Sequence, residues 1–180
     1  MLRALDIILA FVGLILLAPV FGCLLIIGFF VSGSPIFSQV RLGLNKEPFV
    51  IYKFRTMKRS TASLPTHLIK NQTTTTFGKI LRTTKLDEIP QLWNVLKGEM
   101  SLVGPRPGLA NQHELTILRE KLGVFSAKPG ITGLSQISGI DMSRPKELAE
   151  CDADMIRSMS LKNYFRYIFG TFKPTKRWHK

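Results

Sequence analysis

Residues 7–31 read IILAFVGLILLAPVFGCLLIIGFFV, and this stretch decides how the chain is placed. It holds 25 consecutive residues without a charged side chain. As a straight helix it would extend about 37 Å, enough to cross a hydrocarbon core about 30 Å thick. A secretory signal peptide is disfavoured, because the run is longer than the usual apolar region and the following SGSPIFSQV is a poor cleavage site. The sequence therefore predicts a membrane segment.

Pro19 stands in the middle of this stretch, with twelve residues on each side. Proline removes a backbone hydrogen bond and clashes with the preceding turn, so we expect a kink near Ala18. Each half would then be about 18 Å long, too short to cross alone. Two topologies remain open: a kinked spanning helix, and a re-entrant helix-break-helix that returns to the face it entered. In the second, Met1 would be cytoplasmic, like the basic remainder of the chain.

The charge lies outside this segment. Arg3 and Asp6 are the only charged residues before Arg41, yet the formal net charge of the 180 residues is +13. Such an excess predicts an anionic partner: a phospholipid surface, a nucleotide diphosphate or a nucleic acid. Two distant cysteines and three isolated histidines exclude a disulfide framework and a zinc motif, and neither a Walker loop nor a dinucleotide glycine fingerprint is present.

Beyond residue 34 the sequence predicts short elements joined by turns. Alternating β-branched and aromatic residues predict a strand over 48–55, and the polar stretch 58–76 predicts a loop. Turns are predicted at 33–35 and 129–133, and the Pro-Arg-Pro of 105–107 must be extended and rigid. Helices are predicted over 77–82, 89–98, 110–124 and from 147 onward. The expected fold class is therefore mainly α with a little β.

Two helical segments carry further expectations. The helix at 89–98 is predicted to present one apolar face, made of Ile89, Leu92, Trp93 and Leu96. The C-terminal segment from Tyr164 to Trp178 mixes aromatic residues with cations, which suits the headgroup layer of a membrane. It is predicted to contact membrane lipids; the alternative is a packed core helix followed by a basic tail.

Two adjacent carboxylates, Asp87 and Glu88, stand at a predicted helix start near Arg82 and Lys85. Phosphoryl transfer needs a nucleophile, a divalent metal and cations that hold the phosphate oxygens, and a carboxylate can be that nucleophile through an acyl phosphate. The structural alternative is that Asp87 caps the helix and Glu88 is a first-turn acid. Arg106 is more specific, because its stiff loop preorganises the guanidinium for an oxyanion.

Residues 86–107, LDEIPQLWNVLKGEMSLVGPRP, closely resemble the signature of the bacterial sugar transferases, the small monotopic phosphoglycosyl transferases. Three further blocks agree with that family: Pro35-Ile36-Phe37 followed by Gln39, Arg41 and Gly43; Lys53-Phe54-Arg55-Thr56-Met57; and residues 129–136, PGITGLSQ. The resemblance runs in order over nearly the whole chain, from about residue 3 to 170. It implies a membrane segment at 1–34, re-entrant and broken at Pro19, and a catalytic domain at 35–180 with amphipathic interfacial helices.

The resemblance also implies a reaction and a site. Sugar-1-phosphate would pass from a UDP-sugar to polyprenyl (undecaprenyl) phosphate in two steps, with release of UMP, as the first membrane step of glycoconjugate assembly. Asp87 would be the nucleophile and a ligand of Mg²⁺, and Glu88 would assist it. The implied place is the cytoplasmic face of the bacterial inner membrane. The substrate-binding residues implied are Lys53, Arg55, Arg82, Gln91, Arg106 and Pro107.

Some positions depart from the family pattern, and two other functions compete. Ala18 replaces the serine before the breaking proline, Ile140 and Asp141 follow Ser138-Gly139 where arginine is frequent, and Lys58-Arg59-Ser60 replace acidic residues. A nucleic-acid-binding domain on a membrane anchor and a non-enzymatic membrane scaffold both fit the charge. Neither gives the Asp-Glu pair a role, so we expect no nucleic-acid partner. A homo-oligomer is left open.

Overall fold

The structure is a computed structural model and describes residues 2–57 and 74–172. Predictions that fall on residues 58–73 and 173–180, including most of the polar loop and the end of the basic tail, lie outside the described residues. Most of the described chain is helical and two small two-stranded sheets complete it, so the predicted mainly α class with a little β is confirmed. The longer helices are α1 (Leu2–Ser32), α2 (Thr76–Thr83), α3 (Gln91–Lys97), α4 (His113–Lys121), α6 (Pro145–Arg157) and α7 (Leu161–Gly170).

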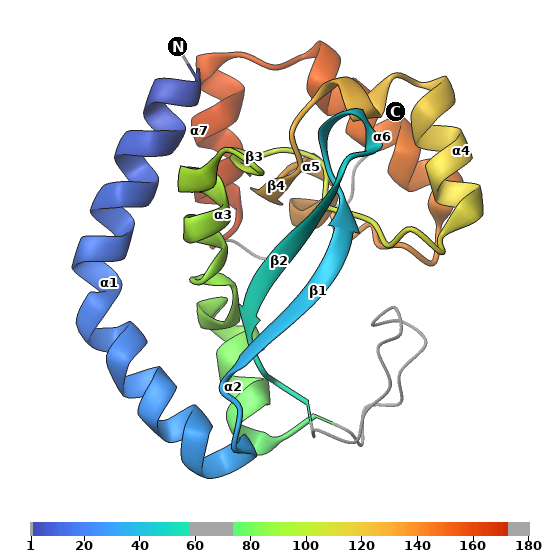
Figure 1. The fold of residues 1–180 in the computed structure, drawn as a ribbon. Helices are drawn as coiled ribbons and strands as arrows, with labels where there is room; N and C mark the ends of the chain where they lie inside the picture. Colours follow the sequence, from blue (N-terminus) through green and yellow to red (C-terminus); the bar gives the residue numbers. More distant parts are fainter. Residues whose placement is uncertain (1, 58–73, 173–180) are drawn as a thin grey trace.

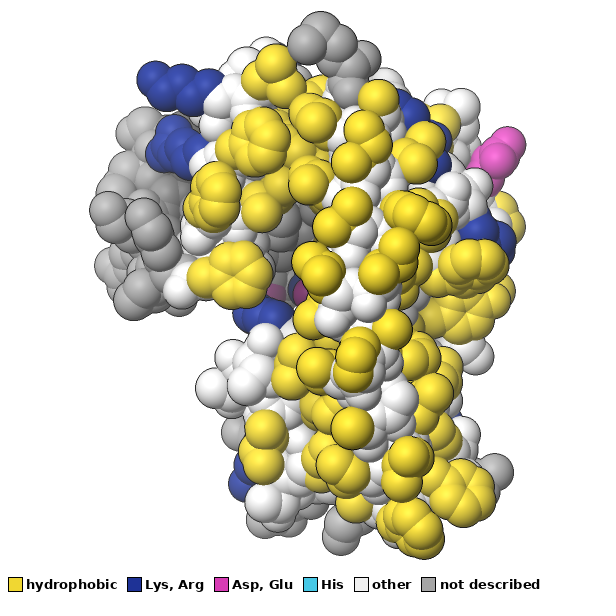
Figure 2. Space-filling model, turned by 90° about the vertical axis from the view of Figure 1, so that its left-hand side faces the viewer, with side chains coloured by type: hydrophobic (Ala, Val, Ile, Leu, Met, Phe, Trp, Pro, Cys, Tyr) yellow, Lys and Arg dark blue, Asp and Glu magenta, His cyan; other side chains and the backbone are white. Residues whose placement is uncertain are grey.

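Helix α1 runs without interruption across Pro19 and bows around one side of the molecule (Figure 1). It bends in its middle instead of breaking there. Within the described residues it is the one helix long and apolar enough to cross a membrane by length and composition. Its outer face exposes a row of large apolar side chains, from Ile7 to Val31, which form a continuous apolar surface in Figure 2. Helix α1 therefore fits a membrane anchor.

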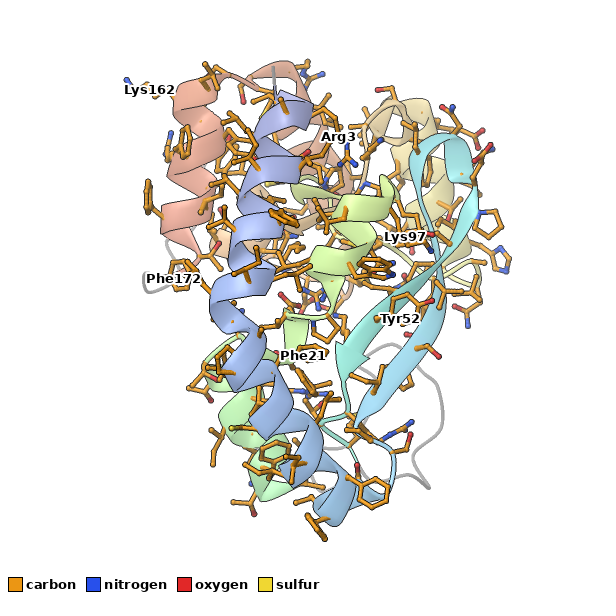
Figure 3. The ribbon with its side chains drawn as sticks, turned by 60° about the vertical axis from the view of Figure 1, so that its left-hand side comes forward. Arg3, Phe21, Tyr52, Lys97, Lys162 and Phe172 are labelled. Atoms are coloured by element: carbon orange, nitrogen blue, oxygen red, sulfur yellow. The ribbon has the colours of Figure 1, made fainter. Side chains whose placement is uncertain are left out.

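The inner face of α1 is attached to the rest of the molecule near both ends. In its first turn, the Arg3 guanidinium lies between α1 and α3 (Figure 3) and donates to the carbonyl oxygens of Leu96 and Met100 at 3.2 and 3.4 Å. Further along, the Phe21 ring packs against Phe54 with centroids 5.1 Å apart. Gly28 lies against Pro35, where a Cβ would come within 2.9 Å of the proline Cβ. Both halves of α1 thus face the same body.

An antiparallel hairpin follows α1. Strand β1 (Ile36–Leu42) pairs with β2 (Pro48–Phe54), and a short 3-10 turn, η1 (Leu44–Lys46), joins them. The prediction of β2 is confirmed; β1 was missed. Arg41 is directly opposite Phe49 in the register, and side chains of opposed residues share a face. With the two-residue repeat of a strand, Arg41 shares the inward face with Phe49, Ile51 and Lys53.

The second sheet brings two distant glycine-containing segments together. Strands β3 (Ser101–Val103) and β4 (Gly130–Thr132) pair in parallel. A Cβ on Gly130 would lie 2.0 Å from the Gly104 nitrogen, so the two backbones approach closely only because both residues are glycine. The prediction of a turn at 129–133 was wrong over 130–132, because pairing with a strand nearly thirty residues earlier extends this backbone. Because the Gly130 N–H donates to the Pro105 carbonyl at 2.9 Å, the Pro-Arg-Pro loop lies beside β4.

Two helical predictions need correction. In α3, Ile89 just before it and Leu92 and Leu96 within it pack inward, but Trp93 is exposed, and its predicted place on the buried face was wrong. Asn94 is buried in its stead. The helix predicted from 147 onward is two helices, α6 and α7, because Ser158–Ser160 separates them and the Ser160 hydroxyl caps α7 at Asn163. The helix predicted over 110–124 is confirmed as the shorter α4, followed by the 3-10 turn η5 (Val124–Ser126).

Helix α7 shows both of the characters foreseen for the C-terminal segment. Its Tyr164 and Tyr167 are buried in a core with Val103 and Met155. On the opposite side, Leu161, Phe165, Phe169 and, past the helix end, Phe172 are exposed. The packed-helix alternative thus describes the buried face of α7, and the predicted contact with lipid headgroups stays a prediction for its exposed apolar face.

Candidate active site

Asp87 and Glu88 lie in a 3-10 turn, η4 (Leu86–Glu88), that leads into α3. Lys85, just before the turn, takes left-handed backbone angles, φ 61° and ψ 10°, and so reverses the chain after α2. Neither carboxylate caps α3, whose first flanking residue, Pro90, makes no side-chain capping bond. The structural alternative, in which Asp87 is only a helix cap, is therefore not what the structure contains.

Glu88 lies between two cations. Its Oε1 is 3.5 Å from Lys53 Nζ and 3.6 Å from Arg106 Nη1, and 13% of its side chain is exposed. Burial raises the pKa of this carboxyl, but the charges of Lys53 and Arg106 outweigh that effect and hold the pKa below its usual value. Glu88 therefore stays ionised and joins strand β2 to the Pro-Arg-Pro loop.

Asp87 is in the opposite electrostatic state. Burial, followed by the neighbouring Glu88 charge, raises its pKa to about 6, although Lys53, Arg82 and Arg106 act against that rise. No hydrogen bond or ion pair joins the Asp87 carboxylate to another side chain in the described part of the chain. The group is thus ionised at neutral pH, weakly solvated and not held by a partner, which are the properties of a carboxylate nucleophile.

Three of the cations around this pair have lowered pKa values, because they are buried and lie close to another cation. Burial, then the charge of Arg106, lowers the pKa of Lys53 to about 8, and the same two causes lower the pKa of Arg41 to about 10. For Arg82 burial is again the largest cause of a lowered pKa, while Asp87 acts the other way. Its Nε donates to the Thr56 hydroxyl at 2.9 Å, which fixes the guanidinium beside the site.

Arg41 is a site residue that sequence reasoning did not assign. Its Nη1 donates to the carbonyl of Pro107 at 3.3 Å and its Nη2 to Gln39 Oε1 at 2.6 Å. Its Nε is buried and has no partner among the described residues. Strand β1, which carries Arg41 onto the inward face, was not predicted; with that strand in place, its opposition to Phe49 would have pointed to this position.

Asn94 holds α3 against the hairpin. This fully buried side chain donates to the Val50 carbonyl and to Glu99, both at 2.7 Å, and accepts from the Tyr52 backbone at 3.2 Å. The neighbouring residue after Tyr52 is Lys53, so this contact sets the separation between the carboxylates and their lysine. The structure shows why the amide matters, because a buried amide needs partners, but nothing in the local sequence indicated that Asn94 would be buried.

The other predicted binding residues are distributed as follows. Gln91 is buried, with its Nε2 unpartnered among the described residues. Pro107 is buried and offers its carbonyl to Arg41. Arg55 lies at the base of the hairpin, where its Nε donates to the Ser34 carbonyl at 2.9 Å and its guanidinium stacks over Phe37 at 5.5 Å. The structure brings Lys53, Arg82 and Arg106 together around the acids and places Arg55 on the backbone that follows α1.

The donor set was compared with what Mg²⁺ requires. Within the described residues no group of three or more acidic, histidine or cysteine side chains could hold a metal ion. Mg²⁺ is, however, commonly bound through one or two carboxylates together with substrate phosphates. Asp87 supplies one carboxylate without a competing side-chain partner, so the residues fit a metal held jointly with a phosphate and do not form a site by themselves.

Four cations, Lys53, Arg41, Arg82 and Arg106, therefore surround the two carboxylates Asp87 and Glu88. The positive excess, partly buried, favours a ligand with at least two negative charges. Figure 2 shows a hollow beside the apolar face of α1, at the bottom of which acidic and basic side chains are visible. The arrangement is a cationic site that suits phosphate, with a carboxylate that has no side-chain partner among the described residues, next to an apolar surface.

The comparisons with known proteins agree with this class of site. The chain belongs to the bacterial sugar transferase family, whose pattern matches residues 1–177. It is 38% identical over 186 residues to the galactosyl transferase CpsE of Streptococcus agalactiae serotype III (strain NEM316). It is 36% identical over 179 residues to a UDP-glucose:undecaprenyl-phosphate glucose-1-phosphate transferase of Escherichia coli (strain K12).

The coverage of these relatives is uneven. The matched regions take in 95% and 94% of this chain, but only 41% and 39% of those two proteins. The exopolysaccharide production protein ExoY of Sinorhizobium fredii (strain NBRC 101917 / NGR234), 37% identical, is matched over 82% of its length. The chain thus spans about two fifths of the first two relatives and most of the third, and the family resemblance expected from the sequence is confirmed.

Proposed function

We propose that this chain transfers a sugar-1-phosphate from a UDP-sugar to a polyprenyl phosphate, with release of UMP. The observation that carries the proposal is the Asp87 carboxylate, partnerless among the described side chains and surrounded by cations. Relatives named as undecaprenyl-phosphate glucose-1-phosphate transferases support undecaprenyl phosphate as the acceptor. The sugar is left open, and UDP-glucose and UDP-galactose are the first donors to test.

The reaction would proceed in two displacements at one phosphorus atom. An Asp87 carboxylate oxygen attacks the β-phosphorus of the UDP-sugar, the bond to the bridging oxygen breaks, and UMP leaves. The sugar phosphate is then joined to Asp87 as an acyl phosphate. An oxygen of the polyprenyl phosphate attacks the same phosphorus and Asp87 leaves as a carboxylate, giving the polyprenyl diphosphate sugar.

The chain's own cations would bind and orient the phosphates. Arg106 and Lys53 hold the transferring group through its oxygens, and Glu88 keeps both cations in place. Arg82 and Arg41 lie beside them to hold the nucleotide's phosphates. A Mg²⁺ bound by Asp87 and the donor's diphosphate would neutralise charge that develops on the leaving UMP.

We further propose that α1 is re-entrant, with both of its ends on the cytoplasmic face of the inner membrane. Arg3 near one end and Gly28 near the other both contact the charged body. If α1 crossed the bilayer as a straight rod, that body would lie at hydrocarbon depth, which buried charges do not tolerate without partners. The bend of α1 and its apolar outer face fit a segment that dips into one leaflet.

Topology is tested with single cysteines. In a background with Cys23→Ala and Cys151→Ala, the variants Leu2→Cys and Gly33→Cys should both react with an impermeant maleimide applied from the same side of sealed vesicles. Reaction from opposite sides would establish a spanning helix instead. Cysteine at exposed position 144 is the control for the cytoplasmic side.

The reaction is tested by UMP release from a panel of UDP-sugars with undecaprenyl phosphate and Mg²⁺. We expect release with at least one donor and its loss, by about 10³-fold or more, in Asp87→Asn. Asp154→Asn, which removes a carboxylate on α6 outside the site, is the matched control and should keep wild-type turnover. A donor incubated without acceptor should leave one sugar phosphate on the Asp87 peptide in a mass spectrum. Undiminished release from Asp87→Asn would exclude the covalent step.

A further inference from the structure

Arg119, on α4, lies outside the carboxylate site and contacts the backbone of the Pro-Arg-Pro loop. Its Nη1 donates to the backbone carbonyl of Arg106 at 2.9 Å. The same guanidinium donates through Nη2 and Nε to Asp152 Oδ2, at 2.6 and 3.1 Å. Asp152, on α6, accepts a further bond from the Ser135 hydroxyl at 2.9 Å. The Arg119–Asp152 pair thus connects helices α4, α5 (Leu134–Ile137) and α6 to the loop.

This ion pair is fully buried, with 3% of the Arg119 side chain and none of the Asp152 side chain exposed. It adjoins an apolar cluster that includes Leu115, Leu148 and Cys151. A buried ion pair is not a favourable way to gain stability, because desolvation offsets its attraction and an apolar pair of similar volume does as well or better. Stability alone therefore does not explain why an ion pair, rather than an apolar pair, stands at this place.

The loop itself indicates what that role is. Three successive carbonyls are held from outside: Arg106 by Arg119, Pro107 by Arg41 at 3.3 Å and Gly108 by the Leu42 backbone at 3.0 Å. Each of the two prolines fixes its own φ, which leaves the segment fewer accessible conformations. The Arg106 guanidinium is 41% exposed and its one ion pair among the described residues, to Glu88, is loose at 3.6 Å, so its place at the site also depends on where this backbone is held.

We propose that the Arg119–Asp152 pair is a positioning device that sets the Arg106 guanidinium for the phosphate. This inference rests on the proposed function and deepens it. Arg119 does not itself touch substrate; it acts through the carbonyl of Arg106. A displacement of about 1 Å at a group that contacts the reacting phosphate can lower turnover by about 100-fold.

The variant that isolates this role is Arg119→Met with Asp152→Leu. It replaces the pair by apolar side chains of similar volume, so the fold is expected to be kept, with a Tm within a few degrees of wild type. We expect kcat for UMP release to fall about 10- to 100-fold. Lys46→Gln with Glu120→Gln removes an exposed ion pair between the hairpin end and the same helix α4, and is the matched control, expected to keep wild-type kcat.

A double-mutant cycle with Arg106→Ala separates positioning from general damage. Once the Arg106 side chain is absent, replacing the buried pair should change kcat by less than 2-fold. The dissociation constant for UDP, measured by titration calorimetry, should show the same pattern and does not require turnover. Arg119→Lys is the second variant: it keeps the charge opposite Asp152 but not the fork that reaches two acceptors, and should lower kcat in the same direction.

The outcomes are distinguishable. If the folded apolar-pair variant keeps wild-type kcat and UDP affinity, the positioning role is wrong, whatever the reaction. If it loses as much in the Arg106→Ala background as in wild type, the pair acts by another route and the inference also fails. If wild type releases no UMP from any donor, the proposed function fails, and the UDP titrations still decide whether Arg119 acts through Arg106.

Discussion

Two of the buried charge clusters in the described part of the chain, one at Asp87 and Glu88 and one at Asp152, are built differently. At the carboxylate site, four cations face two acids, and the two ion pairs of Glu88 are loose, at 3.5 and 3.6 Å. Around Asp152, one cation faces one acid, with contacts of 2.6 and 3.1 Å and a hydroxyl completing them. The saturated pair around Asp152 holds helices and the Arg106 loop in one arrangement, whereas the unbalanced group around Asp87 leaves an acid without a side-chain partner among the described residues and suits an anionic ligand.

The largest effect that this comparison predicts is on stability. Asp152→Ala leaves the Arg119 guanidinium buried without its acid, and we expect the free energy of unfolding to fall by about 3–5 kcal/mol. Denaturant unfolding of the detergent-solubilised protein measures it. The variant with Arg119→Met and Asp152→Leu, which replaces the whole pair, should regain most of the stability that Asp152→Ala loses. If Asp152→Ala loses less than about 1 kcal/mol, the Arg119 charge is compensated by other groups when Asp152 is absent. The contrast between the two clusters is then wrong.

The second prediction is a gain in stability, not a loss, when a charge is removed. The folded pKa of Asp87, about 6, lies above its ordinary value of 3.8. The folded state therefore binds this proton more tightly than the unfolded state does, and it loses stability as the pH rises from about 4 to 6. Asp87→Asn removes that cost, so we expect it to stabilise the protein by up to about 3 kcal/mol at pH 7.

The pH dependence of that gain is its check. The stabilisation by Asp87→Asn should shrink as the pH falls from about 6 to 4 and vanish below about pH 3, where Asp87 is protonated in both the folded and the unfolded state. Asp154→Asn is the control and should change stability by no more than about 0.5 kcal/mol at either pH. A destabilised Asp87→Asn protein at pH 7 would show that the surrounding cations need the charge of this carboxylate, and that the site is balanced without a ligand.

The third prediction concerns rate. The acidic limb of kcat/KM for UMP release should lie near pH 6, where Asp87 ionises, and the basic limb near pH 8, where Lys53 loses its proton. Outside these limits activity should change about 10-fold per pH unit, about 1.4 kcal/mol of barrier. Lys53→Arg should move the basic limb upward and leave the acidic limb in place. A profile that is flat from pH 5 to 9 would exclude both assignments.

The sequence predicted those parts of the site that lie close together along the chain. The Asp-Glu pair, the stiff Pro-Arg-Pro loop, the strand with Lys53 and the apolar N-terminal helix all follow from local pattern. Arg41, Asn94 and the Arg119–Asp152 pair could not be found in that way. Each acts across dozens of residues, through a strand register or a buried contact that no short window contains.

The same limit explains the incorrect elements. Residues 129–133, PGITG, look like a turn because three of the five are glycine or proline, yet 130–132 form a strand because Gly104 permits another backbone to approach. Trp93 was expected inside because periodicity counts apolar residues, but Asn94 takes the buried position, since it alone can bond strand β2. In both cases a tertiary hydrogen bond outweighs the local preference.

The smallest predicted effect comes from a third kind of ion pair. Lys46 and Glu120 join the hairpin end to α4, 74 residues apart, one position from Arg119, but both are largely exposed. Water and salt screen such a pair, so Lys46→Gln with Glu120→Gln should lower stability by no more than about 1 kcal/mol and leave kcat unchanged. Unfolding curves at low and high salt measure it, and the difference from wild type should shrink as salt rises. A loss comparable to that of Asp152→Ala would mean that connection between elements, and not burial, gives an ion pair its importance here, which would remove the physical ground for separating the two buried groups.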